Sequence, residues 1–233
     1  MKSVFISGTD TDVGKTFVSR LLLQKLNKRG KRTIGFKPIS AGCIETADGL
    51  RNDDALILQS ASLIDAEYQH VNPIAFKPAI APHIAAEEIN QPLSLGDLQS
   101  HYEQIKQYNA DLTLIEGAGG WRLPINNRGQ FLSDFVIQNQ IPVILVVGMR
   151  LGCLNHALLT HQAIENDQLD CVGWIANQLS CDMPYYEENL AALNKLLPAP
   201  MLAEVKFNSK PENTESSMLS TDAFDIAFDG SFS

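Results

Sequence analysis

A loop that contains glycine, lysine and threonine lies near the start of the chain. In FISGTDTDVGKTFVSRLLL, residues 5–23, a β-like run leads through the loop into a helical pattern at Gly14-Lys15-Thr16. Such a loop can bind phosphate through its backbone N–H groups, while Lys15 reaches the β- and γ-oxygens and the Thr16 hydroxyl ligates Mg²⁺. The usual motif has four residues between its first glycine and Gly-Lys-Thr, but five separate Gly8 from Gly14. Two interpretations follow: a variant phosphate loop, which the flanking strand and helix favour, or a glycine turn with a solvent-exposed lysine.

Two carboxylates are candidates for a magnesium site, because Mg²⁺ prefers oxygen ligands and takes only one or two carboxylates from protein. Glu116 ends an apolar run and precedes the glycine-rich stretch Gly117-Ala118-Gly119-Gly120. Asp54 lies near the start of a helical pattern in LRNDDALIL. For Asp53 and Asp54 an alternative remains, because a carboxylate at that place can also cap the helix.

Three more polar side chains follow or interrupt apolar runs. Lys37 comes after a strand pattern in FKPISAG and is either a strand-end cation or a second cation beside a triphosphate, where it would stabilise charge on a transferred phosphoryl group. Asn177 in WIANQ is either a turn residue or a partner for a nucleobase edge. His83 is more typical of a residue packed in a loop than of a base.

The elements that position these residues alternate between strand and helix patterns. Short runs rich in Val, Ile and Leu predict strands, and apolar residues at helical spacing predict helices between them. The predicted strands cover 3–7, 32–37, 112–116, 142–148, 171–177 and 201–205, and the predicted helices cover 16–29, 52–61, 132–140, 153–165 and 184–197. This alternation is typical of a doubly wound α/β fold with a mostly parallel sheet flanked by helices, whose ligands bind at the carboxyl edge of the sheet.

The domain organisation follows from the same pattern. Residues 1–207 are predicted to form one domain, within which 65–110 interrupt the alternation and form an insertion over the carboxyl edge. Residues 208–233 are polar and weakly periodic, which predicts a loosely ordered tail.

Composition narrows the function classes. Of the 233 residues, 45% are hydrophobic, and 18 basic against 27 acidic residues give a net charge of −9. This charge offers no electrostatic footprint for nucleic acid, so any phosphate site is local. The four cysteines show no CxxC spacing, which favours reduced thiols and a cytoplasmic protein. We expect neither a signal peptide before MKSVFISG nor a membrane span.

Taken together, an ordered set of motifs resembles the dethiobiotin synthetase family. The set consists of GTDTDVGKT, FKPISAG, GLRNDDA, VNPIAF with APHIAA, LIEGAGGW, PVILVVGMRLGCLNHALLT and GWIANQ, and it spans roughly residues 1–200. Other phosphate-loop proteins share the first motif and lack the rest. The resemblance also accounts for the spacing of the loop, which in this family reads Gly-Thr-Asp-Thr, two residues, then Gly-Lys-Thr.

The resemblance implies a cyclo-ligase with a phosphate-loop NTPase-like fold. ATP, with Mg²⁺, and CO₂ would close a urea ring on 7,8-diaminopelargonic acid and give dethiobiotin, ADP and phosphate, in biotin synthesis. One amine takes up CO₂ to form a carbamate, the carbamate attacks the γ-phosphorus, and the second amine displaces phosphate from the mixed anhydride. The family is homodimeric.

By motif position, the resemblance also implies a role for individual residues. Lys37 and Lys15 would be catalytic, and Thr16, Asp54 and Glu116 would bind the metal. Nucleotide contacts would come from Asp12, Val13, Gly14, Lys15, Thr16, Phe17, Glu116, Gly117, Ala118, Gly119, Asn177, Gln178 and Glu212. Thr11, Lys37 and Ala41 would face the diamine, and its carboxylate tail would meet Leu151, Gly152, Cys153 and Asn155 of the neighbouring subunit.

A protein of a different class remains as an alternative. Related folds serve as nucleotide switches or partitioning proteins, in which hydrolysis drives exchange of a partner. An enzyme needs an enclosed pocket where Lys37 meets the segment around Pro82-His83, whereas a switch places a partner surface there. The sequence favours the enzyme.

Overall fold

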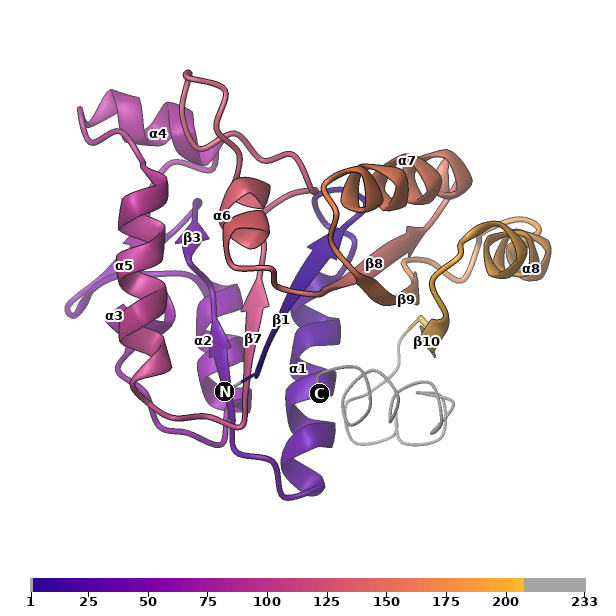
Figure 1. Cartoon of the computed structure of the whole chain (residues 1–233), viewed down its shortest axis with the longest axis horizontal. Coiled ribbons are helices and arrows are strands. Elements are labelled where there is room, and N and C mark those ends of the chain that lie inside the picture. The colour runs from indigo at the N-terminus through magenta and orange to yellow at the C-terminus, as the bar shows by residue number, and fades with distance from the viewer. Residues whose placement is uncertain (1, 208–233) are drawn as a thin grey trace.

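A six-stranded parallel sheet forms the centre of the protein (Figure 1). The computed structural model describes residues 2–207, so the predicted tail 208–233 lies outside the described residues. The strand order is β10-β9-β8-β1-β7-β2. Their bounds are β1 Lys2–Gly8, β2 Thr33–Phe36, β7 Leu112–Glu116, β8 Val143–Met149, β9 Cys171–Gln178 and β10 Met201–Val205. All six predicted strands are therefore confirmed, as is the fold class.

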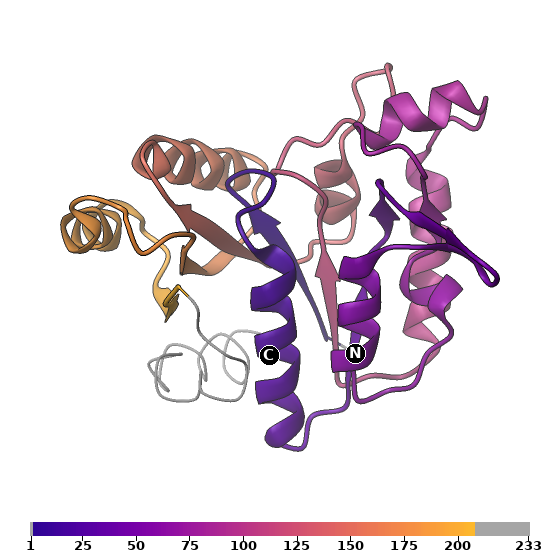
Figure 2. The same cartoon turned by 180° about the vertical axis from the view of Figure 1, so that it is seen from behind.

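Helices cover both faces of the sheet, which is why its strands are apolar without alternation. On one face lie α1 (Lys15–Lys28) and α2 (Asp53–Ala61), which the view from behind shows in front of the sheet (Figure 2). Their apolar residues pack against side chains such as Val4 and Ile6. On the other face, α5 (Leu95–Lys106), α6 (Leu132–Gln138), α7 (Cys153–Asn166) and α8 (Tyr186–Leu196) pack against side chains such as Phe5 and Trp174. The two buried layers fix β1 between its neighbours and hold its carboxyl end, where the phosphate loop begins.

The segment 65–110 divides into two parts with different positions. Its first part contains α3 (Tyr68–Val71), β6 (Ile74–Ala75) and α4 (Pro82–Glu88), and β6 pairs with the short strand β3 (Ile39–Ser40). Its second part is α5, which buries Leu98 and Ile105 in the core rather than extending over the carboxyl edge. The prediction of one insertion over the whole span thus differs from the structure, because α5 is amphipathic and its apolar side covers the sheet. An exposed hairpin of β4 (Ile44–Thr46) and β5 (Gly49–Arg51) precedes α2.

Two further findings concern the described residues alone. The four cysteines are free thiols. Within residues 2–207, every helix is too short or too polar to cross a bilayer.

The contact between β9 and β10 leads to a stability prediction. A Cβ atom on Gly173 would lie 2.4 Å from Leu202 Cγ, which belongs to the core. We expect Gly173→Ala to lower the free energy of unfolding by about 1–3 kcal/mol, as overpacked core positions do. Urea unfolding followed by circular dichroism measures the change.

Gly96→Ala is the matched control for this substitution. Gly96 lies in the first turn of α5, and the nearest atom to its added Cβ is Ser94 Oγ at 3.6 Å. Here the added Cβ makes only an ordinary van der Waals contact, so stability should stay equal or rise by up to about 1 kcal/mol through helix propensity. Equal losses in both variants would contradict the packing argument.

Candidate active site

The loop between β1 and α1 has the geometry that a phosphate loop requires. Gly14 adopts φ 83° and directly precedes α1, so the loop backbone curls around the helix N-terminus. A Cβ on Gly14 would lie 2.1 Å from Asn177 Nδ2, and that amide donates a hydrogen bond to Val13 O at 2.8 Å. Asn177, at the end of β9, therefore fixes the loop from behind. Gly14 is needed both for the left-handed backbone and for this close approach.

Lys15 is buried, which contradicts the interpretation of the loop as a glycine turn with a solvent-exposed lysine. The side chain is 7% exposed, and Nζ donates to Asp10 O at 3.1 Å. Burial, together with the charge of Lys37, lowers the pKa of Lys15 to about 8, although nearby carboxylates act in the opposite direction. A buried ammonium with one protein acceptor can offer its remaining hydrogens to an anion in the loop.

Lys37, Asp54 and Glu116 meet at the carboxyl edge beside this loop. Lys37 Nζ lies 2.7 Å from Glu116 Oε1, 3.2 Å from Asp54 Oδ2 and 3.3 Å from Gly117 O. Lys37 and Glu116 are 3% and 0% exposed, and the Thr16 hydroxyl donates to Glu116 Oε1 at 2.8 Å. The two strand ends and the starts of α1 and α2 therefore place one ammonium, two carboxylates and one hydroxyl together.

The charges of this cluster stabilise one another. Burial alone would lower the pKa of Lys37, but the charges and hydrogen bonds of Glu116 and Asp54 raise its pKa above the ordinary value. Burial alone would raise the pKa of Asp54, but Lys37 and the Thr16 hydroxyl hold it below the usual range. Lys37 is thus an ammonium and Asp54 a carboxylate at neutral pH.

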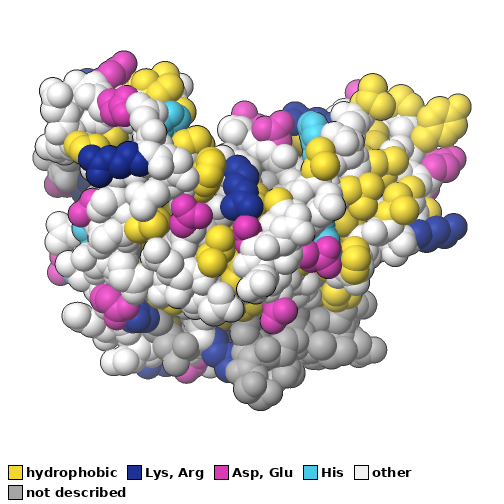
Figure 3. All heavy atoms as spheres, turned by 45° about the horizontal axis from the view of Figure 1, so that its top comes forward, with side chains coloured by type: hydrophobic (Ala, Val, Ile, Leu, Met, Phe, Trp, Pro, Cys, Tyr) yellow, Lys and Arg dark blue, Asp and Glu magenta, His cyan; other side chains and the backbone are white. Residues whose placement is uncertain are grey.

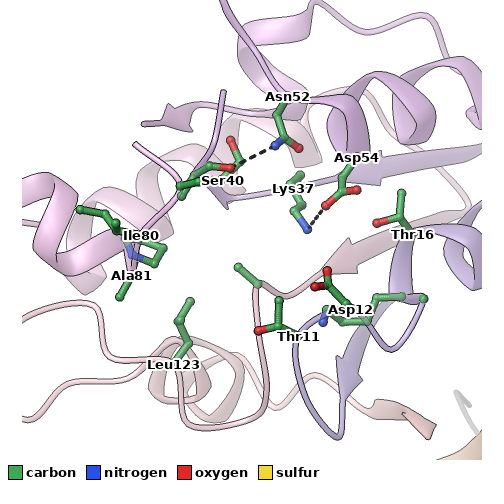
Figure 4. A pocket seen from close by; sticks show the side chains of 17 residues that line it. Thr11, Asp12, Thr16, Lys37, Ser40, Asn52, Asp54, Ile80, Ala81 and Leu123 are labelled. Atoms are coloured by element: carbon green, nitrogen blue, oxygen red, sulfur yellow. Dashed lines mark hydrogen bonds and ion pairs between the residues drawn. The ribbon is translucent and has the colours of Figure 1, made fainter. Parts of the chain in front are cut away.

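The helix that carries Asp54 is capped by a different residue. Asn52 Oδ1 accepts a hydrogen bond from Ala55 N at 3.2 Å and is the N-cap of α2. The alternative in which Asp53 or Asp54 caps this helix is therefore wrong. Asp54, in the first turn, is free to turn toward Lys37 (Figure 4).

A cavity of about 910 Å³ opens over this cluster. One side is polar, with Asp12, Thr16 and Lys37, and the other is apolar, with Ile80, Ala81 and Leu123 (Figure 4). The space-filling view shows this face hollowed between the part that carries α4 and the part that carries α7 (Figure 3). The lining residues are Thr11, Asp12, Gly14, Lys15, Thr16, Lys37, Ser40, Ala41, Asn52, Asp54, Ala79, Ile80, Ala81, Pro82, Ala118, Gly119 and Leu123.

Most of the predicted phosphate, metal and substrate residues thus line or adjoin one cavity. Glu116 and Gly117 do not line the cavity but accept hydrogen bonds from Lys37, which does. Val13 and Phe17 pack toward the core behind the loop. Asn177 contacts the loop backbone, and Gln178 Oε1 accepts from Phe207 N at 3.1 Å. Glu212 lies outside the described residues.

Residues 151–155 are not part of the cavity within one chain. They form the turn before α7 and its first residues, where Gly152 adopts φ 95°. The Leu151 side chain is 99% exposed, Asn155 is exposed and Cys153 is buried. Their predicted contact with the carboxylate tail of the substrate stays a prediction.

Several cavity residues were not predicted from the sequence. Asn52 and Ser40 lie beside predicted residues, and the order Asn-Asp-Asp before a helix was a usable signal for Asn52 as the N-cap. Ile80 and Leu123 come from loops whose positions depend on contacts distant in sequence. His83 lies in the first turn of α4 and does not line the cavity, and its Nδ1 is buried without a hydrogen-bond partner.

Comparisons with known proteins point to one family. A family model described as an AAA domain matches residues 2–215. The ATP-dependent dethiobiotin synthetase BioD of Aeromonas salmonicida (strain A449) is 54% identical over 211 residues, which are 91% of this chain and 93% of that protein. The proteins of that name from Pseudoalteromonas translucida (strain TAC 125) and Pseudomonas aeruginosa (strain UCBPP-PA14) are 52% and 47% identical, over 87% and 88% of this chain and 89% and 90% of theirs.

A solved structure supports the fold. The septum site-determining protein MinD from Pyrococcus horikoshii OT3, complexed with Mg-ADP, superposes with a TM-score of 0.52 at 17% identity, covering 99% of this chain and 91% of that one. At this identity the likeness shows the phosphate-loop NTPase fold alone.

Proposed function

Because this chain belongs to the family of ATP-dependent dethiobiotin synthetases, we propose that its cavity carries out the reaction with Lys15 and Lys37 as the two working cations. The protein is a ligase that forms C–N bonds: it closes the ureido ring on diaminopelargonic acid at the expense of ATP, in biotin synthesis. The observation that carries the assignment of roles is the buried Lys37, which faces the cavity that Lys15 also lines.

In this proposal Lys15 and the loop backbone bind the β- and γ-phosphates. The N-terminus of α1 adds the positive end of the helix dipole. Lys37 lies where the γ-phosphate and the diamine meet, and its ammonium stabilises the negative charge of the carbamate and of the transferring phosphoryl group. Thr11 and the backbone at Ala41, which line the cavity, face the diamine. Asn177 and Gln178 lie toward the adenine.

The oxygen atoms beside Lys37 fit a magnesium ion. Thr16 Oγ1, Asp54 and Glu116 supply the hard ligands that Mg²⁺ prefers. Glu116 Oε2 is buried and has no hydrogen-bond partner in the structure, so one carboxylate oxygen is left for a cation. Bound there, Mg²⁺ would neutralise charge on the β- and γ-phosphates.

A direct experiment tests the function. We expect the protein to convert 7,8-diaminopelargonate, bicarbonate and MgATP to dethiobiotin, which mass spectrometry identifies. ATP hydrolysis that proceeds equally without the diamine, with no dethiobiotin, would instead support the nucleotide switch. The cavity, which residues 79–82 wall on one side, favours the enzyme, because a small substrate needs a concave site of this kind and a partner surface does not.

The magnesium site leads to a prediction for its two carboxylates. Asp54→Asn and Glu116→Gln should each raise the Mg²⁺ concentration that half-saturates activity by about tenfold or more, because a neutral amide is a poorer ligand for a hard dication. Because both carboxylates would share one ion, the double variant should show less than the sum of the two effects. Magnesium titrations of activity measure this, and Asp53→Asn is the adjacent control. Titrations that match the wild type in both single variants would place the metal elsewhere.

We also propose a homodimer whose sites are completed across the interface. The exposed turn at Leu151-Gly152 and the N-terminus of α7 would offer N–H groups to the carboxylate tail bound by the neighbouring subunit. The cytoplasmic location likewise stays a prediction.

Mixing two inactive variants tests the shared site. A Lys15→Ala chain and an Asn155→Glu chain should regain up to about a quarter of wild-type activity per chain after subunit exchange, because half of the dimers are hybrids with one intact site of two. Sedimentation measures the oligomer. A monomer, or no rescue after exchange, would remove the shared site.

A further inference from the structure

The motif VNPIAF contains a buried asparagine to which none of the assigned roles applies. Asn72 is 2% exposed and ends α3, where its backbone N–H donates to Tyr68 O at 2.8 Å. Its Nδ2 donates to the carbonyl oxygen of Lys37 at 2.7 Å and faces Ile74 O at 3.5 Å. Its Oδ1 accepts from Ser40 Oγ at 2.7 Å and from the Tyr68 hydroxyl at 3.1 Å. The amide is therefore directed entirely at the protein and does not line the cavity.

One arm of this network leads to the helix that carries Asp54. The Tyr68 hydroxyl, which donates to Asn72, accepts a hydrogen bond from Asn52 N at 2.8 Å. Asn52 caps α2, in whose first turn Asp54 lies, and its Nδ2 donates to Ala41 O at 3.4 Å. Asn52, Asp54 and Lys37 appear together at one side of the cavity in Figure 4.

The other arm holds the chain that carries Lys37. Lys37 N donates to Val71 O at 2.8 Å, and Asn72 Nδ2 holds the carbonyl oxygen of the same residue. The Ser40 hydroxyl, three residues further on, is bound to Asn72 Oδ1. One side chain thus connects the end of β2, the stretch beside Ala41 and the start of α2.

We propose that Asn72 is a positioning residue that sets Lys37 and Asp54 in their working arrangement. The proposal rests on the proposed function of Lys37. The Lys37 ammonium lies on a flexible stem between two carboxylates, 2.7 and 3.2 Å away, and those distances depend on where β2 ends and α2 begins. Misplacing a catalytic group by 1 Å can cost about 10²-fold in rate. If the network served stability alone, its removal would lower the melting temperature and leave kcat of the folded enzyme unchanged.

Three variants separate these cases. Asn72→Ala removes the connection, and Tyr68→Phe removes only the arm toward Asn52 and disturbs the fold less. Asn139→Ala is the matched control, because Asn139 ends α6, donates to Phe135 O at 2.9 Å and contacts no cavity residue among those described. Dethiobiotin formation gives kcat and the KM for the diamine, calorimetry gives the Kd for MgATP, and thermal unfolding gives the folded fraction.

We expect Asn72→Ala to lower kcat by at least about tenfold while its Kd for MgATP stays within about threefold, since the phosphate loop is untouched. Tyr68→Phe should lower kcat by a smaller factor, about threefold, and it decides the matter if Asn72→Ala does not fold. Asn139→Ala should lower stability alone. An unchanged kcat in folded Asn72→Ala, or in Tyr68→Phe when Asn72→Ala does not fold, would overturn the proposal.

A double-mutant cycle shows whether Asn72 acts through Lys37. In a Lys37→Gln background, Asn72→Ala should reduce kcat by a smaller factor than in the wild type, because one of the two groups that Asn72 positions is already gone and only Asp54 remains. Full additivity would overturn the proposed route. If Lys37→Gln alone turned over at the wild-type rate, the proposed function of Lys37 would be wrong and the positioning role would fall with it. A slow Lys37→Gln beside a normal Asn72→Ala would remove the positioning role alone.

Discussion

Lys37→Gln will bind MgATP nearly as the wild type does and form dethiobiotin about 10²–10³ times more slowly. Glutamine keeps most of the length of the side chain and removes its charge. In our proposal the ammonium acts on charge that develops during the reaction, so its loss lowers kcat more than nucleotide affinity. The expected factor is that of removing one preorganised electrostatic contact from a catalytic site, about 10²–10³.

The fold of this variant needs its own measurement. Glu116 is fully buried and loses its cationic partner at 2.7 Å, and breaking a buried ion pair from one side destabilises proteins by about 3–5 kcal/mol. The new amide can still donate a hydrogen bond to Glu116, which offsets part of this loss. Thermal unfolding with and without MgATP therefore accompanies the kinetics, and kcat is taken per folded molecule.

Lys77→Gln is the matched control for Lys37→Gln. Lys77 also forms an ion pair with a carboxylate, 2.8 Å from Glu45, but both side chains are about two-thirds exposed at 67% and 69%. Exposed pairs contribute about 0–1 kcal/mol, so this variant should keep normal stability and kcat. An unchanged kcat in Lys37→Gln as well would mean that Lys37 is only a strand-end cation.

The sequence predicts for a simple physical reason that Lys37 and Glu116 lie at the same edge of the sheet, whereas the place of Asp54 beside them is implied by the family resemblance alone. The carboxyl ends of parallel strands lie at one edge of a sheet, so residues that follow β2 and β7 must come together there. The strands themselves are recognisable because a sheet covered on both faces needs continuous apolar runs. The phosphate loop is recognisable because its glycine, lysine and threonine are consecutive in the chain.

Features that depend on contacts distant in sequence were beyond such reasoning. The amide of Asn177 donates a hydrogen bond to Val13 O, which is 164 positions away in the chain, and no local sequence pattern indicates that contact. Ile80 and Leu123 both line the apolar side of the cavity, although each belongs to an irregular loop. Asn72 occurs in a recognisable motif, but its hydrogen bonds to Lys37 and Ser40 appear only once β3 and β6 are paired.

Lys15→Met will bind MgATP about 10–100 times more weakly and lose turnover, yet the protein without nucleotide will be more stable than the wild type at pH 7. The buried ammonium has a pKa of about 8, below its ordinary value of 10.5, chiefly because of desolvation. The folded state therefore disfavours the charged form, and the cost is fully present below pH 8. A pKa shift of this size corresponds to a destabilisation on the order of 3 kcal/mol. Removing the charge should restore part of this free energy of unfolding.

The pH dependence of this gain has a definite sign. Between pH 8 and 10.5 the unfolded chain binds more protons at Lys15 than the folded one, so wild-type stability rises with pH in that window. The advantage of Lys15→Met should shrink accordingly as pH rises through 8. Urea unfolding at several pH values, with EDTA and without nucleotide, measures this difference. A constant difference, or a variant less stable than the wild type at pH 7, would contradict the buried-cation argument.

With MgATP bound, we expect the wild type to be more stable than Lys15→Met. The phosphates supply the anionic partner that the ammonium lacks, and a charge-assisted hydrogen bond contributes about 1.5–3 kcal/mol, so the variant should bind MgATP about 10–100 times more weakly. Saturating MgATP should raise the melting temperature of the wild type much more than that of Lys15→Met. Lys28→Met, at the far end of the same helix, controls for the loss of a lysine from α1. Calorimetry that gave equal MgATP affinities for wild type and Lys15→Met would refute the phosphate-binding role of the loop lysine.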